Sequence, residues 1–76
     1  MPGSDLEHVR DVLERHREDL KLRYRAAGTG IGRRSAQDRT LVIVVYLESS
    51  RDLPRDPQSV EGVPLRFEVT GPIRLL

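Results

Sequence analysis

Seven consecutive apolar residues, LVIVVYL at Leu41–Leu47, lie in the middle of a chain of only 76 residues. Successive side chains of a β-strand point to opposite faces of a sheet, so a strand of this composition is apolar on both faces. One face would carry Leu41, Ile43, Val45 and Leu47, and the other would carry Val42, Val44 and Tyr46. The run therefore predicts a central strand, and each of its two faces needs a cover.

The first third of the chain predicts the cover for one face, an amphipathic helix over residues 5–23. Ser4 and Glu7 have the spacing of a capping box, and acidic residues precede basic ones along the segment, as the helix dipole favours. Apolar residues recur every three or four positions, which places them on one stripe. The stripe consists of Leu6, Val9, Leu13 and Leu20, with Val12 and Tyr24 at its margins.

Glycine at every second position, in AAGTGIG at residues 26–32, predicts a strand over residues 26–33. Gly28, Gly30 and Gly32 would share one face of it, and a face without side chains lets a large neighbouring side chain approach. The run does not fit a nucleotide-binding loop, because a helix precedes it and no Gly-Lys-Ser/Thr follows. The polar residues 34–39 then predict a hairpin loop to a strand over residues 40–48.

A connection of some fifteen residues with two prolines follows, and its length indicates a crossover, with a helical turn expected near residues 56–60. Alternation from Val63 onward predicts a half-buried strand over residues 63–70. The apolar residues 73–76 are a candidate for pairing back onto the sheet edge. The expected fold class is α+β, a helix on one face of a sheet of three or four strands, in the order α-β-β-crossover-β.

Length and composition narrow the class of protein. The chain has room for one domain, which we expect to span residues 1–76. It contains no cysteine, which excludes disulfides and cysteine-ligated metals and fits a reducing compartment. No segment approaches the roughly 20 apolar residues that span a bilayer, and the N-terminus lacks the features of a signal peptide. We therefore expect a cytoplasmic protein with no membrane association and no cofactor.

Two histidines raise the question of a metal site or a pH switch. His16 falls on the apolar stripe, where we expect it at the core margin with its ring edge reaching water or a backbone carbonyl; a buried switch is the alternative. His8–Asp11 and His16–Asp19 repeat the pattern H-x-x-D. The two pairs lie about 80° apart around the helix and some 12 Å apart along it, too far for one ion, so no metal site is expected.

The residue inventory offers no catalytic centre. Nucleophilic catalysis needs a hydroxyl or thiol beside a general base, and both histidines lie within the first sixteen residues, on the predicted helix. The serines after the helix fall in predicted loops without a motif such as G-x-S-x-G. We therefore expect no enzymatic activity.

The second face of the central strand points to a partner. Val42, Val44 and Tyr46 would form an apolar strip on a face that is otherwise polar, which is typical of a homo-oligomer or a docked protein partner. The alternative is that Tyr46 lies across the neighbouring glycines and hides the strip within the chain. The first arrangement predicts a protein-interaction or oligomerisation domain.

Nucleic-acid binding is the alternative function. Residues 15–39 carry eight bases and three acids, a net charge of +5. A basic rim around the glycine strand could contact phosphates, although the few aromatic residues provide a poor stacking platform. The candidate rim consists of Arg23, Arg25, Arg33, Arg34 and Arg39.

The segments GTGIG, VIVVYLE, DLP, EGVP and VTGPIR, over roughly residues 26–74, together resemble a small domain of uncharacterised bacterial and archaeal proteins. Its pattern runs GVGIG, VYV, LP, GVP and a final glycine, and Thr29 stands where Val is usual. The domain occurs alone or ahead of trypsin-like serine peptidase domains. The resemblance implies an accessory domain with no catalytic residue carried over. It implies structural roles for Gly28, Gly30, Gly32, Tyr46, Leu53, Pro54, Gly62, Pro64 and Gly71.

Overall fold

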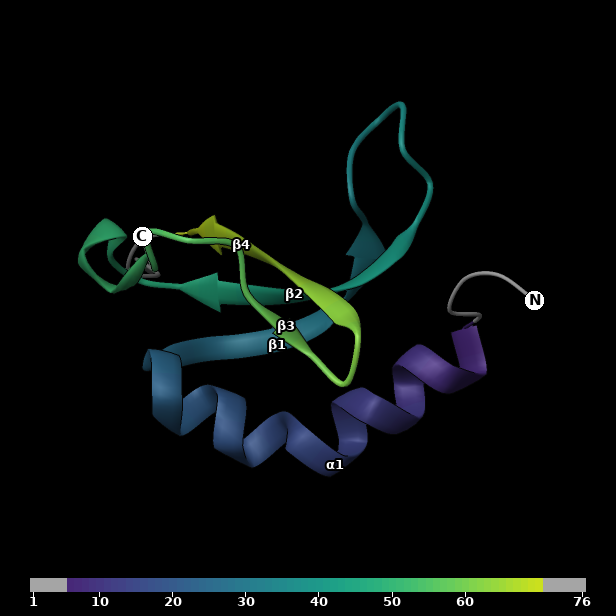
Figure 1. The fold of residues 1–76 in the computed structure, drawn as a ribbon. Coiled ribbons are helices and arrows are strands. Elements are labelled where there is room, and N and C mark those ends of the chain that lie inside the picture. The colour runs from purple at the N-terminus through teal and green to yellow at the C-terminus, as the bar shows by residue number, and fades with distance from the viewer. Residues whose placement is uncertain (1–5, 71–76) are drawn as a thin grey trace, which may run out of the picture.

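The computed structural model describes residues 6–70 and has one helix packed on one face of a four-stranded sheet (Figure 1). The expected α+β fold class is confirmed. The elements are α1 (Leu6–Tyr24), β1 (Ala26–Arg33), β2 (Leu41–Leu47), the 3-10 helix η1 (Ser50–Asp52), β3 (Ser59–Val60) and β4 (Val63–Val69). The expected bounds of the long helix and of the three long strands agree with these to within one residue.

Helix α1 packs through the predicted stripe. Val9, Val12, Leu13, Leu20 and Tyr24 are buried, whereas Leu6, also expected on the stripe, is 48% exposed at the start of the helix. The Ser4 side of the expected capping box lies outside the described residues. No helix in the described part of the chain is both long and apolar enough to cross a membrane.

The sheet has the strand order β1-β2-β4-β3, so the apolar run forms an interior strand. β1 and β2 form an antiparallel hairpin, with Gly32 opposite Val42. β2 and β4 are parallel, with Val45 opposite Phe67, and parallel neighbours require the predicted crossover.

The crossover differs in detail from the expectation. Its helical turn is η1, at whose start the Ser49 hydroxyl accepts a hydrogen bond from the N–H of Arg51, and not a turn near residues 56–60. Residues Ser59–Val60 instead form the short strand β3, which pairs with β4 through the two-residue turn Glu61-Gly62. The fourth strand is therefore β3. The candidate at residues 73–76 lies outside the described residues.

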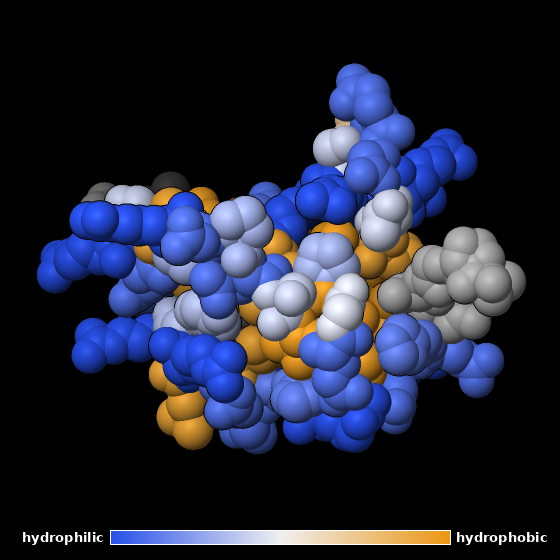
Figure 2. Space-filling model, viewed as in Figure 1, coloured by the Kyte–Doolittle hydropathy of each residue, from blue (hydrophilic) through white to orange (hydrophobic). Residues whose placement is uncertain are grey.

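The core lies between α1 and the inner face of the sheet. On β2 it contains Ile43, Val45 and Leu47, and Leu41 is partly buried at its edge, which is the face that the sequence assigns to the helix. The rings of Tyr24 and Phe67 meet edge to face, with centroids 4.9 Å apart. Figure 2 shows apolar surface open to view among polar side chains, on the side of the molecule where β3 and β4 lie.

Candidate interaction surface

The outer face of the sheet, opposite α1, is closed within the chain. Val42 and Val44 are 0% and 1% exposed, and Tyr46 is partly buried. The ring of Tyr46 lies across Gly30, where an added Cβ would be 3.6 Å from Cε2 of the ring. The exposed apolar strip expected from these three residues is therefore wrong, and the alternative, in which Tyr46 lies across the glycines, describes the structure.

Arg66 of β4 completes this cover. Its Nη1 donates to the carbonyl oxygen of Arg33 at 2.9 Å, and its Nη2 contacts a carboxylate oxygen of Glu68 at 2.8 Å. Because β2 lies between β4 and β1, the side chain must reach across the strand that carries Val44. The Nε of Arg66 is buried without a partner among the described residues, as expected when the stem lies against apolar neighbours.

The open surface of the sheet is instead the edge of β1. Within residues 6–70, β1 pairs only with β2. The N–H of Arg34 donates to the carbonyl of Thr40 at 2.9 Å. Arg34 lies two residues after the last glycine of β1, and this bond continues the register of the β1–β2 ladder. Alternate residues of an antiparallel ladder bond to the partner strand. The three glycines of β1 therefore bond to β2, and the residues between them turn their backbone groups away from it.

Thr29 and Ile31 are those residues, and each presents one N–H and one C=O group at the free edge. No hydrogen bond joins either residue to another part of the described chain outside the β1–β2 ladder. The regular edge ends at both sides. At its start, a register shift between Ala26 and Gly28 leaves Ala27 unpaired. At its end, the carbonyl of Arg33 accepts a hydrogen bond from Arg66. A short, unpaired stretch of backbone remains between the two ends.

The five arginines of the predicted basic rim lie at opposite ends of β1. Arg23 and Arg25 precede the strand, whereas Arg33 ends it, and Arg34 and Arg39 belong to the following loop. At about 3.3 Å per residue, Arg25 and Arg33 are about 26 Å apart along the strand. The structure therefore does not bring the five side chains into one rim.

Some of these arginines have carboxylate partners within the chain. Arg23 pairs with Asp19 at 2.9 Å, and Arg34 is 3.9 Å from Asp38. Arg25, Arg33 and Arg39 are exposed and make no ion pair within residues 6–70. One exposed cation therefore precedes the free edge, and two follow it.

Arg25 also has an unusual backbone conformation. Its φ of 55° lies in the left-handed region, at the junction where α1 ends and β1 begins. Glycine or asparagine usually occupies such a position, because a larger side chain is strained there.

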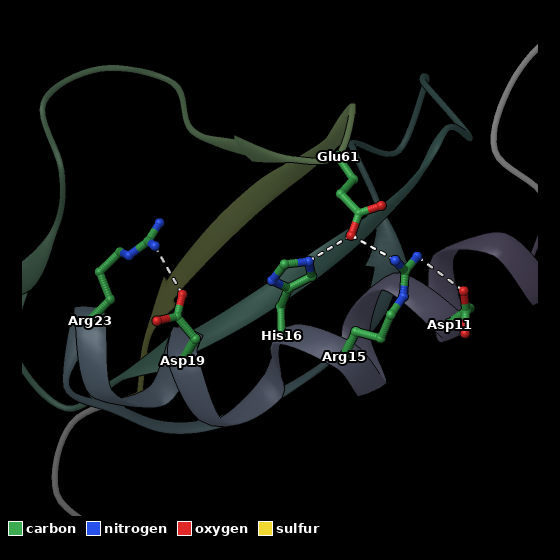
Figure 3. A network of polar contacts seen from close by, with 6 residues as sticks. All are labelled: Asp11, Arg15, His16, Asp19, Arg23 and Glu61. Carbon is green, nitrogen blue, oxygen red and sulfur yellow. Dashed lines mark hydrogen bonds and ion pairs between the residues drawn. The ribbon is translucent and has the colours of Figure 1, made fainter.

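Glu61 joins the β3–β4 turn to the helix (Figure 3). One oxygen of its carboxylate lies 2.7 Å from Nε2 of His16 and 3.0 Å from Nη1 of Arg15. Arg15 also pairs with Asp11 one turn earlier in α1 at 3.0 Å. Glu61 has a φ of 47° and Gly62 a φ of 80°, as a tight two-residue hairpin turn requires. The network therefore holds a strained turn against α1.

These contacts change the acidity of Glu61. The hydrogen bond from His16 and the charge of Arg15 lower the pKa of the Glu61 carboxyl, and partial desolvation opposes them. In the β1–β2 loop, hydrogen bonds from the side chain and the backbone of Thr40 lower the pKa of Asp38. Both carboxylates stabilise folded turns through their ionised form.

His16 lies at the core margin, as expected, and its Nε2 contacts a carboxylate, a partner that the sequence does not predict. The sequence pattern predicts no specific partner for Glu61 or Arg66. The only sequence signal for Glu61 is the pair Glu61-Gly62 between Val60 and Val63, a two-residue turn between apolar positions. Nothing in the sequence pattern indicates the reach of Arg66 to β1.

Few features of a ligand site are present in the described part of the chain. No pocket and no group of three candidate metal ligands occurs there. The hydroxyls of Ser35 and Ser49 accept backbone hydrogen bonds within their own turns.

No protein-family model, curated protein or solved structure matches the chain. The resemblance to the small domain that precedes peptidases therefore stays a prediction.

Proposed function

We propose that this chain is a protein-interaction domain, without catalytic activity of its own, that accepts a strand from a partner at the free edge of β1. The observation that carries the proposal is the pair of outward-facing residues Thr29 and Ile31. Each offers a hydrogen-bond donor and an acceptor with the spacing of a strand. An extended polypeptide satisfies such groups by adding a strand to the sheet.

The rest of the sheet offers less to a partner. The opposite edge consists of the two-residue strand β3 and the last residues of β4 beyond it, where only Phe67 and Val69 face away from β2. The outer face is covered by Tyr46 and Arg66, and the inner face is covered in large part by α1. The edge of β1 belongs to an eight-residue strand that, within residues 6–70, pairs only on the side facing β2.

The residues that could support catalysis have structural partners instead. His16 bonds to Glu61, and the hydroxyls of Ser35 and Ser49 cap turns. A shallow sheet edge also provides no enclosed volume to exclude water from a reaction. These features favour binding over chemistry.

The proposal is tested by selecting binders from an unbiased library of displayed random peptides, with Thr29→Pro and Thr29→Val as the matched pair. Proline removes the outward N–H of Thr29 and leaves the bonds of the glycines to β2, whereas valine keeps the N–H. We expect selected peptides to bind the wild type and Thr29→Val and to lose at least tenfold in affinity for Thr29→Pro.

The absence of any selected peptide, or binding that Thr29→Pro leaves unchanged, would overturn the proposal. If Thr29→Pro does not fold, the selected peptides are N-methylated instead, on alternate residues. Methylation of the set that faces β1 must then abolish binding, and methylation of the other set must preserve it.

A further inference from the structure

We infer that the segment bound at the edge of β1 carries acidic residues at both of its ends. This inference rests on the proposed function and adds the chemical class of the partner. The observations behind it are the free backbone between the ends of β1 and the unpaired arginines that flank it.

The flanking charges have the same sign at both ends. Arg25 precedes β1, and Arg33 and Arg39 follow its free stretch, all three exposed and without an ion pair within residues 6–70. A strand added beside β1 would run past both groups over about 26 Å, which is about eight extended residues. Carboxylates at its two ends would meet a guanidinium at each end, whichever direction it runs.

The same charges disfavour a second copy of this chain as the occupant. Antiparallel pairing of two β1 strands about Thr29 would bring Arg25 of each copy beside Arg33 of the other. Parallel pairing in register would bring each arginine beside its own equivalent. Like charges placed opposite each other on neighbouring strands are destabilising, so both arrangements are opposed.

The backbone groups disfavour a nucleic acid. Thr29 and Ile31 present carbonyl oxygens as well as N–H groups, and a phosphate oxygen can use only the donors. A polypeptide strand uses both. The separation of the arginines into two groups also suits two separate acidic positions better than a continuous phosphate backbone.

The middle of the segment follows from the faces of β1. On the outer face its neighbours would be glycines, and on the inner face they would be Thr29 and Ile31, which pair with Val45 and Ile43 of β2. Alternating threonine and valine match these neighbours, because β-branched side chains pack well between strands.

The test uses three labelled peptides with this middle, as long as β1, that differ only in their ends: glutamates, glutamines or lysines. Fluorescence anisotropy at low salt gives the affinity of each for the whole chain. We expect the glutamate-ended peptide to bind about tenfold more tightly than the glutamine-ended one, and the lysine-ended one to bind most weakly. The difference should shrink as salt rises.

Two variants locate the effect. Arg25→Asn removes the cation before β1 and keeps a residue that tolerates the left-handed conformation, and Arg33→Gln removes one of the two cations at the other end. We expect each to reduce the advantage of the glutamate ends about threefold. The control is Arg55→Gln, in the connection that leads to the opposite edge of the sheet, which should leave the advantage unchanged.

The outcomes separate this inference from the proposed function. Equal affinity for glutamate and glutamine ends, with both lost in Thr29→Pro, would overturn the acidic preference and leave the proposed function standing. Failure of every peptide, including those from the unbiased selection, would overturn both. A dimer in sedimentation equilibrium that Thr29→Pro dissociates would assign the edge to a second copy. Binding of random RNA or DNA without binding of the glutamate-ended peptide would also contradict the inference.

Discussion

At the scale of single residues, Gly32 lies beside the side chain of Val44 on the outer face of the sheet. A Cβ added there would lie 2.9 Å from Cγ2 of Val44, closer than van der Waals contact allows. We expect Gly32→Ala to lower the free energy of unfolding by about 1–3 kcal/mol, measured by urea denaturation.

Gly28 provides the matched control for this prediction. A Cβ added at Gly28 has nothing within 4 Å, so Gly28→Ala should be neutral or stabilise the protein by up to about 1 kcal/mol. Equal destabilisation by the two substitutions would show that the close approach to Val44 is not the cause.

Two substitutions of Arg66 separate the effect of its side-chain stem, which covers the outer face, from the effect of its charge. Arg66→Met keeps an unbranched apolar stem and removes the buried Nε, so we expect it to change stability by less than about 1 kcal/mol. Arg66→Ala removes the stem and exposes apolar neighbours such as Val44, and should cost about 1–2 kcal/mol. Equal losses in both variants, measured by thermal and urea unfolding, would contradict the stem's role.

The contacts of residues far apart in the chain are what sequence reasoning cannot supply. The closure of the outer face is one of two arrangements that the alternation in Leu41–Leu47 and the glycine run leave open. The bond from Arg66 to Arg33 and the bond from His16 to Glu61 span 33 and 45 residues. They depend on how the sheet and the helix are placed relative to each other, which local periodicity does not encode.

At the scale of elements, periodicity is sufficient wherever an element is long enough to show it. The 3–4 spacing predicts α1, and alternation or a continuous apolar run predicts β1, β2 and β4. β3 has two residues, too few for a period, so its position cannot be predicted from the pattern. The expectation of a single arginine rim is wrong because β1, an extended strand of eight residues, lies between the arginines that precede it and those that end or follow it. The strand holds these two groups of arginines far apart.

The network in which Glu61 joins α1 to the β3–β4 turn should make the free energy of unfolding depend on pH in the acid range. In the unfolded chain the Glu61 carboxyl titrates near its ordinary pKa of 4.5, and in the folded protein its pKa is lower. The folded state therefore binds this proton more weakly. The stabilisation from ionised Glu61 is fully present above pH 4.5 and is lost as pH falls through the folded pKa.

Comparison of wild type with Glu61→Gln tests this linkage. We expect the unfolding free energy of the wild type to fall more steeply below pH 4.5 than that of Glu61→Gln, and the difference to shrink at high salt because the carboxylate is exposed. Parallel pH profiles of the two proteins would show that ionised Glu61 does not contribute to stability through this network.

At the scale of the whole molecule, the fold is a half-open sheet. Its helix covers most of one face, Tyr46 and Arg66 cover the other, and the short strand β3 covers the beginning of β4 at one edge. Among residues 6–70, the edge of β1 keeps free backbone groups between two basic ends. The proposed function as a binding domain rests on this asymmetry more than on any single side chain.

The most direct measurement is amide hydrogen exchange along β1, followed by NMR in the free protein and with the glutamate-ended peptide. In the free protein we expect slow exchange at Gly30 and Gly32, which bond to β2, and fast exchange at Thr29 and Ile31. The peptide should slow exchange at Thr29 and Ile31 selectively. Slow exchange at all four amides in the free protein, or no slowing with any peptide that binds, would contradict a free edge that accepts a strand.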